Sequence, residues 1–371
     1  MSQTPPPGQN PVDPRAYGGA QGPPAFNSGP PHPGFYPPPR RSGSGKTIAI
    51  VLLTVLLVGS VVVNFALLVA VAAAGASQTA GAYAEHVITP GDRKNKIAVV
   101  PLDGVINSTT RERFNAMIDQ AANDMNVKAI VVEINSPGGE VTPSDEMYDH
   151  LLRAKQRRGI PVVISMSSLT ASGGYYIACA GDEIFAQRTT LTGSIGVLFS
   201  RFDLTGLGEK YGVKDGTIVS DGATFKDAGS MFKPLTPEHE TYFKSILNDA
   251  FVTFKDVVKS GRSTALQKMN KSVDEVANGK IYSADQALQL GLIDSIGYLD
   301  SATSAAAMRA KITGPHIVRI ERVPTFFETL GGQAKGSQIG SVSAKDMSVS
   351  IESDVLQKLG SPKLLYLWNG Q

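Results

Sequence analysis

An unbroken apolar run near the start of the chain restricts its fold more than any other feature. From Thr47 to Gly75 the sequence reads TIAIVLLTVLLVGSVVVNFALLVAVAAAG, without one charged residue. About 20 apolar residues in a helix span the hydrocarbon core of a bilayer, so this run can cross a membrane with some tilt. A secretory signal cut near Ala76 or Ala84 is the alternative, but signal cores are typically about 7–15 residues and follow a short basic segment. The run therefore predicts a retained transmembrane helix over residues 47–75.

The two flanks of the apolar run differ in charge, which predicts the orientation of the chain. Arg40, Arg41 and Lys46 precede the run, whereas residues 77–86 beyond it carry only Glu85. Positively charged residues next to a membrane span are retained on the cytoplasmic side. We therefore expect a single-pass protein of the cell membrane, with its N-terminus in the cytoplasm and its bulk on the outer face.

Composition divides the remainder of the chain. Residues 1–46 are rich in Pro and Gly and bury too little apolar surface to offset their ordering entropy, which predicts a disordered cytoplasmic tail. Residues 76–95 are interpreted as a linker and residues 96–323 as one globular domain without internal repeats. Beyond it the sequence turns Gly- and Ser-rich and closes with LLYLW. Residues 324–371 are thus predicted to be a C-terminal extension, to which the sequence assigns no role.

Charge and cysteine content exclude several classes of function. The 35 basic and 33 acidic residues nearly balance, so no general field would attract nucleic acid. Cys179 is the only cysteine, which excludes an intrachain disulfide, and its small and apolar neighbours predict a buried, inert thiol. No His, Cys and Asp cluster has the spacing of metal ligands, and no phosphate-binding loop is present. We expect neither a metal nor another cofactor.

Strand-like and helix-like runs alternate along the globular part. Near-continuous apolar strands that alternate with helices predict parallel βαβ units, covered by helices on both faces. Thr236 followed by Pro237 predicts the start of a long helix, and Ser283 with Gln286 predicts a capping box at another. The predicted strands are residues 96–106, 128–134 and 161–166, and the predicted helices are residues 108–126, 140–157 and 237–261.

Three loops, each following a strand-like run, carry the candidate chemistry. Residues 135–139 read NSPGG, whose paired glycines present bare backbone N–H groups suited to an oxyanion hole, although an ordinary turn is equally compatible. Residues 170–176 read TASGGYY, which places a hydroxyl at a helix N-terminus, as a nucleophile or as a plain N-cap serine. Residues 190–197 read TLTGSIGV and predict a tight, buried turn.

Together with NGKIYSADQALQLGLID at residues 278–294, these loops resemble those of the signal peptide peptidase A family in order and spacing. The resemblance extends over about residues 97–312. It implies an α/β fold of the ClpP/crotonase type, a spiral of ββα units, and a catalytic dyad of serine and lysine. It further implies a serine endopeptidase that degrades signal peptides or other short hydrophobic segments, and a homo-oligomer around a shared chamber.

The resemblance assigns the catalytic dyad to individual residues. It makes Ser172 the nucleophile and Lys226, within SDGATFKDAGS, the general base. That segment is a residue or two longer than the family pattern, so Lys233 and Lys214 are the alternatives. A lysine base must be neutral, and burial that lowers its reference pKa of about 10.4 to about 7–8 costs roughly 4 kcal/mol. The third loop contains no histidine that could replace it.

The remaining site residues follow from the same mechanism. Backbone N–H groups of Gly138 or Gly139 and of Gly173 are expected to hold the oxyanion of the tetrahedral intermediate. The hydroxyl of Ser194 is the candidate for positioning the lysine, with a simple turn serine as the alternative.

Three other functions stay open on the sequence alone. A crotonase-type acyl-CoA enzyme would share the oxyanion architecture, but an outer-face location would deprive it of CoA. A catalytically inactive membrane scaffold would use the same motifs structurally. A peptidase of this class could also act on other membrane proteins rather than on signal peptides.

Overall fold

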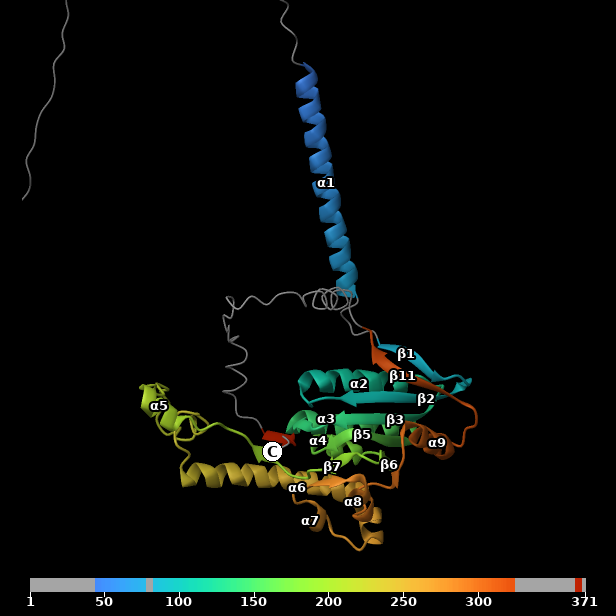
Figure 1. Ribbon diagram of the computed structural model, residues 1–371, viewed down its shortest axis with the longest axis vertical. Helices are drawn as coiled ribbons and strands as arrows, with labels where there is room; N and C mark the ends of the chain where they lie inside the picture. Colours follow the sequence, from blue (N-terminus) through green and yellow to red (C-terminus); the bar gives the residue numbers. More distant parts are fainter. Residues whose placement is uncertain (1–43, 78–82, 324–363, 369–371) are drawn as a thin grey trace, which may run out of the picture. The chain divides into compact units, whose positions relative to one another are not determined.

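The computed structural model describes residues 44–77, 83–323 and 364–368 (Figure 1). Its first element is α1 (Ser44–Ser77), a single helix as the apolar run predicts. Within it, Ile48–Leu67 is long and apolar enough to cross a membrane, and none of that stretch is buried. This helix fits a membrane-anchored protein. Most of the predicted tail, residues 1–43, lies outside the described residues.

A nine-stranded, mostly parallel sheet forms the centre of the globular domain. Its main path runs β1-β11-β2-β3-β5-β6-β10, with β7 beside β5 and β9 beside β7. Only the β1–β11 and β7–β9 pairs are antiparallel. The predicted α/β class is therefore confirmed. The strands are β1 (Tyr83–Thr89), β2 (Asp92–Asp103), β3 (Val127–Ser136), β5 (Val162–Ala171), β6 (Glu183–Ala186), β7 (Leu191–Gly193), β9 (Ile281–Ser283), β10 (Ser295–Ile296) and β11 (Pro315–Arg322).

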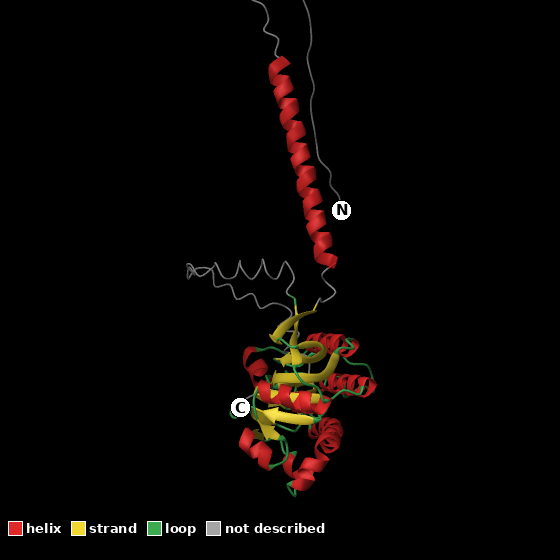
Figure 2. Ribbon diagram, turned by 90° about the vertical axis from the view of Figure 1, so that its right-hand side faces the viewer, coloured by secondary structure: helices red, strands yellow, loops and turns green. Residues whose placement is uncertain are grey.

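The central strands are continuous apolar runs because both of their faces are covered. Successive side chains of a strand point to opposite faces, and in β3 Ile130 and Val132 join one buried cluster while Ala129 and Val131 join the other. The first cluster packs under α2 (Ser108–Asn123) and α3 (Val141–Arg158), and the second under α9 (Leu299–Ala310). Figure 2 shows helices on either side of the strands.

The helix ends follow the capping signals in the sequence. Thr236 caps α6 (Pro237–Lys268) by accepting from the N–H of His239, and Ser283 and Gln286 form the predicted capping box of α8 (Ala284–Gln289). The prediction that α6 ends near Gly261 is wrong. A Cβ at that position would lie 2.2 Å from the carbonyl oxygen of Cys179, so the glycine permits close packing inside the helix.

Two segments outside the predicted domain contribute strands to it. The predicted linker, residues 76–95, contains β1, which extends the main sheet by pairing with β11. The predicted C-terminal extension contains β12 (Leu364–Leu367). This strand lies antiparallel between β4 (Gly138–Glu140) and β8 (Leu198–Phe199) and forms a separate three-stranded sheet with them. Both pairings join parts of the chain that are distant in sequence.

Residues 200–253, here called the arm, extend away from the sheet (Figure 1). The arm contains α5 (Thr205–Tyr211), a series of turns, and the first half of α6, whose buried positions begin only at Phe254. The remaining short helices, α4 (Gly173–Ala178) and α7 (Val273–Val276), pack on the main domain.

Candidate active site

Ser172 stands at the junction of β5 and α4 in a strained backbone conformation. Its φ of 55° and ψ of −114° lie outside the helical region, and its side chain makes no capping bond to the helix that follows. A non-glycine residue held in such a region costs about 1–3 kcal/mol, which persists only where the surrounding fold imposes it. A strained serine on a turn from strand to helix is typical of a nucleophile whose hydroxyl is kept for chemistry.

The ends of three neighbouring strands bring the three predicted loops together. The N–H of Ser172 donates to the carbonyl of Gly193, at 2.8 Å. The hydroxyl of Thr192 donates to the carbonyl of Thr170, and that of Thr170 donates to the carbonyl of Ile134. These bonds fix the ends of β7, β5 and β3 to one another, so the serine loop lies between the other two.

The glycines of the first two loops are in direct contact. A Cβ at Gly173 would lie 3.3 Å from the nitrogen of Gly139 and 3.3 Å from Cα of Gly138. Gly138 itself has a φ of +95°. Its N–H donates to the hydroxyl of Ser136 at 3.1 Å, so this donor is already engaged within its own turn. Among the three predicted oxyanion donors, Gly139 and Gly173 are therefore the better placed pair.

The fourth motif supports the third loop. Ser194, with a φ of 52°, donates its N–H to the carbonyl of Lys280, and Gly279 donates to the carbonyl of Ile195. Ser194 is 8% exposed. It follows Gly193, whose carbonyl accepts the N–H of the candidate nucleophile Ser172. Within the described part of the chain, no hydrogen bond joins its hydroxyl to a lysine.

The three lysines considered as the base all lie on the arm. Lys226 is exposed on the arm, and no hydrogen bond between its side chain and Ser172 occurs among the described residues. Lys233 forms an ion pair with Asp227, which raises the pKa of this lysine, the wrong direction for a base. Lys214 is exposed on the same arm.

None of the described histidines is hydrogen-bonded to Ser172. His150 pairs with Asp119 at 3.1 Å on the helical surface, and His316 accepts the N–H of Gly91 through Nδ1 at 3.2 Å. His239 lies in the first turn of α6, on the arm. Over residues 44–77, 83–323 and 364–368, no group of three or more His, Cys, Asp or Glu side chains could hold a metal ion.

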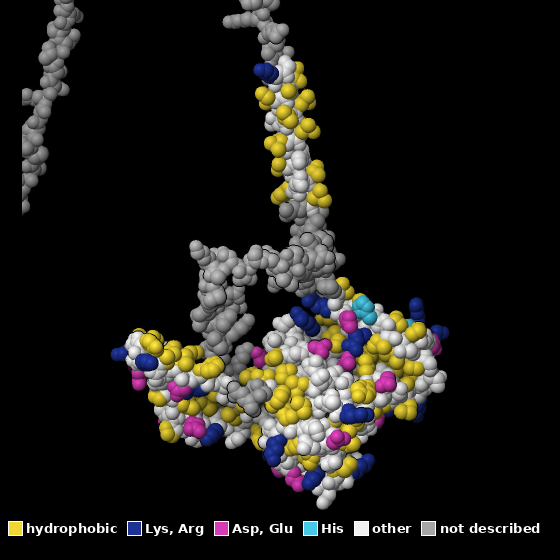
Figure 3. All heavy atoms as spheres, in the orientation of Figure 1, with side chains coloured by type: hydrophobic (Ala, Val, Ile, Leu, Met, Phe, Trp, Pro, Cys, Tyr) yellow, Lys and Arg dark blue, Asp and Glu magenta, His cyan; other side chains and the backbone are white. Residues whose placement is uncertain are grey.

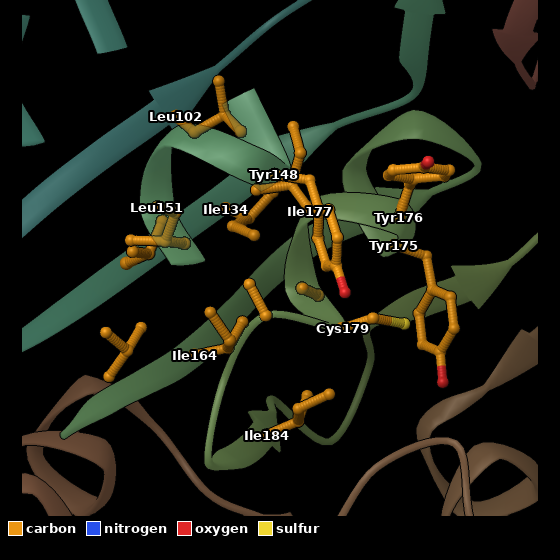
Figure 4. Packing of buried hydrophobic residues seen from close by; sticks show 14 of the residues in the cluster. Leu102, Ile134, Tyr148, Leu151, Ile164, Tyr175, Tyr176, Ile177, Cys179 and Ile184 are labelled. Carbon is orange, nitrogen blue, oxygen red and sulfur yellow. The ribbon is translucent and has the colours of Figure 1, made fainter. Parts of the chain in front are cut away.

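A cluster of polar side chains packs at α4 and consists of Tyr175, Cys179, Arg262 and Asp294. Burial raises the pKa of Cys179 to about 12, which keeps it a neutral thiol as the sequence predicts. Figure 4 shows its sulfur directed toward the ring of Tyr175, whose hydroxyl donates to the carbonyl of Leu292 at 2.8 Å. Arg262 contacts Asp294 through two bonds of 2.8 and 2.9 Å, which ties α6 to the strand and helix around this cluster.

Two neighbours of the site, Tyr366 and Ser144, could not be assigned to it from the sequence. The stretch LLYLW near the end of the sequence forms β12, and Tyr366 in it is fully buried. Its position could not be found from the local pattern, because so short an apolar run does not indicate its pairing partner even where turn residues flank it. Ser144 is a second missed neighbour: its hydroxyl lies 2.5 Å from the point where a Cβ of Gly173 would stand.

Known proteins match the chain over most of its globular part. The model of peptidase family S49 matches residues 154–313, and the Clp protease model matches residues 84–195. The chain is 32% identical to the "Putative signal peptide peptidase SppA" of Enterococcus faecium, over 77% of this chain and 85% of that protein. It is 36% identical to a "Putative protease" of Synechocystis, over 58% of this chain and 75% of that protein. It is 29% identical to "Protease 4" of Haemophilus influenzae, over 76% of this chain and 48% of that protein.

Proposed function

The chain belongs to the signal peptide peptidase A family within peptidase family S49 and is a serine peptidase, and on this premise we propose that Ser172 is its nucleophile. The observation that carries the proposal is the φ of 55° at this serine, on the turn from β5 to α4. Its hydroxyl makes no capping hydrogen bond to α4. The segments that contain Gly139 and Gly193 contact the loop of Ser172. A plain N-cap serine would use its hydroxyl on the helix instead.

The proposed reaction is acyl transfer to Ser172. Its Oγ attacks the carbonyl carbon of a peptide bond while the base takes the hydroxyl proton, and the N–H groups of Gly139 and Gly173 hold the oxyanion. Collapse of the intermediate expels the amine, which receives that proton, and leaves an ester on Ser172. Water then attacks the ester, its proton passes to the same base, and the acid product and free serine are released. The positive φ of Gly138 supplies the turn that aims these donors.

We propose that the base is Lys226 of a second copy of the chain. In one copy this lysine is exposed, and the arm to which it belongs extends away from the sheet. The neighbouring Lys233 is held charged by Asp227, and no hydrogen bond joins a described histidine to Ser172. Docking of the arm onto another copy would remove water from the ammonium group, the condition under which a lysine gives up its proton.

Exposed apolar side chains on the arm support a homo-oligomer. Figure 3 shows hydrophobic side chains gathered on this part of the molecule. A contiguous apolar surface of this kind marks a protein contact, and head-to-tail contacts between identical chains close into rings. The apolar residues of the arm that are at least half exposed are Phe202, Leu207, Tyr211, Val213, Ile218, Tyr242 and Val252.

The substrate and location are proposed from the anchor and the family. We propose that α1 is retained as a single-pass anchor, with the N-terminus in the cytoplasm and the peptidase domain on the outer face, because Arg40, Arg41 and Lys46 precede the span. An enclosed chamber beside the bilayer would admit short, extended hydrophobic segments and exclude folded proteins. Signal-peptide remnants are such segments, and the Enterococcus relative is described as a signal peptide peptidase.

Subunit complementation tests the nucleophile and the base together. Full-length chains carrying Ser172→Ala or Lys226→Ala should each be inactive on a fluorogenic hydrophobic peptide, because members of a dyad act as a unit. Co-expressed in one oligomer, the two variants should recover about a quarter of wild-type turnover, since random mixing places an intact serine beside an intact lysine at about one site in four.

The matched control is Lys233→Ala, which should stay active. Turnover of Ser172→Ala at the wild-type rate would exclude this serine as nucleophile. Inactive single variants without recovery on mixing would place the base in the same copy as the serine.

A further inference from the structure

Asn64 is the only amide side chain in the apolar run of residues 47–75. At 1.5 Å of rise per residue, it lies about 10 Å along the helix axis from the middle of Ile48–Leu67 and about 5 Å from the middle of the whole run. On either count it is inside a hydrocarbon core about 30 Å thick. A polar group at this depth requires a hydrogen-bond partner in protein, because acyl chains offer none.

The helix α1 itself satisfies only the donor side of this amide. Nδ2 of Asn64 donates to the carbonyl of Ser60 at 2.7 Å and to the Ser60 hydroxyl at 3.3 Å. An asparagine amide also accepts hydrogen bonds through Oδ1, and no described side chain of α1 donates to that atom. None of Ile48–Leu67 is buried, and α1 is the only candidate membrane span among the described residues. A donor for Oδ1 therefore has to come from another chain.

Asn64 belongs to a heptad pattern along α1. Residues on its side of the helix recur at alternating spacings of three and four, the pattern with which helices pack as a left-handed coiled coil. Ser60 is the small residue one turn before Asn64, and small residues let two helix backbones approach closely in a membrane. The positions of this pattern, here called the seam, are Ile50, Leu57 and Asn64 at a, and Leu53, Ser60 and Leu67 at d. At 100° per residue, the opposite face carries Val55, Val62 and Ala66.

The chemistry of the seam favours a second copy of this chain as its occupant. Identical single-pass chains insert in the same orientation, so their helices are parallel and their Asn64 side chains reach the same depth. Each amide carries a donor and an acceptor, hence two facing Asn64 side chains complete one another, with Oδ1 of each accepting from Nδ2 of the other. Ile at a and Leu at d favour two strands, and a single Asn at a fixes their register.

We propose that α1 is a pairing surface as well as an anchor, and that the seam packs in parallel against the seam of a second copy, with the two Asn64 amides bonded to each other. The inference rests on the proposed retention of α1 in the membrane. It deepens the proposed homo-oligomer, because paired anchors keep two peptidase domains at a high effective concentration. This concentration favours the supply of Lys226 by one copy to Ser172 of another.

Disulfide crosslinking of full-length chains in membranes tests which face of α1 meets a partner. The chain's own thiol, Cys179, is buried, so the wild-type chain is the blank. With copper phenanthroline as the oxidant, single cysteines on the seam should give an adduct of twice the mass of the chain, and cysteines at matched depth on the opposite face should not. The seam variants are Leu53→Cys, Ser60→Cys and Leu67→Cys, and the opposite variants are Val55→Cys, Val62→Cys and Ala66→Cys.

Removal of the amide is the second test. In the Leu67→Cys chain, addition of Asn64→Leu should raise the protein-to-lipid ratio for half-maximal crosslinking by about 3- to 30-fold, because an interhelical hydrogen bond is lost. Asn64→Gln keeps an amide and should stay closer to the parent chain. Val62→Leu, on the opposite face, is the matched control and should stay within about twofold of the parent. An unchanged ratio for Asn64→Leu would overturn the role of the amide.

Failure of the pairing and failure of its premise give different results. Equal crosslinking on the two faces, or none, in chains that stay in the membrane after an alkaline carbonate wash would overturn the pairing. A seam adduct whose mass is not twice that of the chain would assign the seam to another membrane protein and overturn the second copy as its occupant. Chains released by the wash, or shorter by the mass of α1, would refute the retained anchor. Ser172 is intact in every variant, so peptide cleavage reports on the proposed nucleophile independently.

Discussion

Replacement of Gly138 by alanine is the sharpest perturbation of the proposed oxyanion site. At a φ of +95°, any L side chain is strained, and the new Cβ would lie 2.1 Å from the Tyr366 carbonyl oxygen and 2.6 Å from the Gly173 nitrogen. The methyl group would thus fill the space beside the Gly173 N–H in which the proposed mechanism holds the reacting carbonyl. The strain costs roughly 1–2 kcal/mol, and overpacking against rigid backbone adds about 1–3 kcal/mol. If the methyl group displaces the N–H of Gly139 or Gly173 from the oxyanion, the loss of that donor lowers kcat by about 10²–10³-fold.

Gly159→Ala is the matched control for this prediction. Gly159 ends α3 with a φ of +61°, and no atom lies within 4 Å of the point where its Cβ would stand. The alanine variant therefore carries the backbone strain of a positive φ without a steric clash. Urea unfolding should show Gly138→Ala less stable than Gly159→Ala, and steady-state kinetics should show kcat/KM lowered about 100-fold or more only in Gly138→Ala. If the two variants kept kcat/KM values within about threefold of each other, Gly138 would not border the reacting carbonyl, and the oxyanion assignment would fail.

Two further predictions concern the buried cluster beneath α4. Arg262→Met should lower the free energy of unfolding by about 3–5 kcal/mol in urea titrations, because it leaves Asp294 with a partly buried, uncompensated charge; a loss below about 1 kcal/mol would contradict a structural ion pair. The pKa of Cys179 is raised by burial to about 12 from a reference of 9.0, so between these values the unfolded chain binds fewer protons than the folded one. Stability should therefore fall as pH rises above 9, and Cys179→Ala should reduce that fall.

The central strands and the loops after them could be predicted because their signals are local. The run KAIVVEI becomes β3, and its alternate side chains enter two different clusters because helices cover both faces. Ser172 follows β5 and Gly193 ends β7, and these two strands are parallel neighbours whose ends meet at one edge of the sheet. Their convergence therefore follows from the βαβ pattern, and the structure brings them together.

The remainder depended on contacts that the local pattern does not encode. β1 and β12 find partners far away in sequence, and the polar or short runs that form them indicate no partner. Whether the N–H of Gly138 is free depends on the rotamer of Ser136, which closes the turn on itself. The place of Lys226 depends on the arm, where few buried side chains fix the direction of the chain.

Covalent labelling of the full-length protein tests the central claim most directly. A fluorophosphonate reagent reacts with a serine only when its hydroxyl is activated by a base beside an oxyanion site. Intact-mass and peptide mass spectrometry should find a single adduct, on Ser172, that is absent from Ser172→Ala and forms far more slowly in Lys226→Ala than in Lys233→Ala. An adduct on another serine, or equal labelling rates in the two lysine variants, would contradict the proposed dyad.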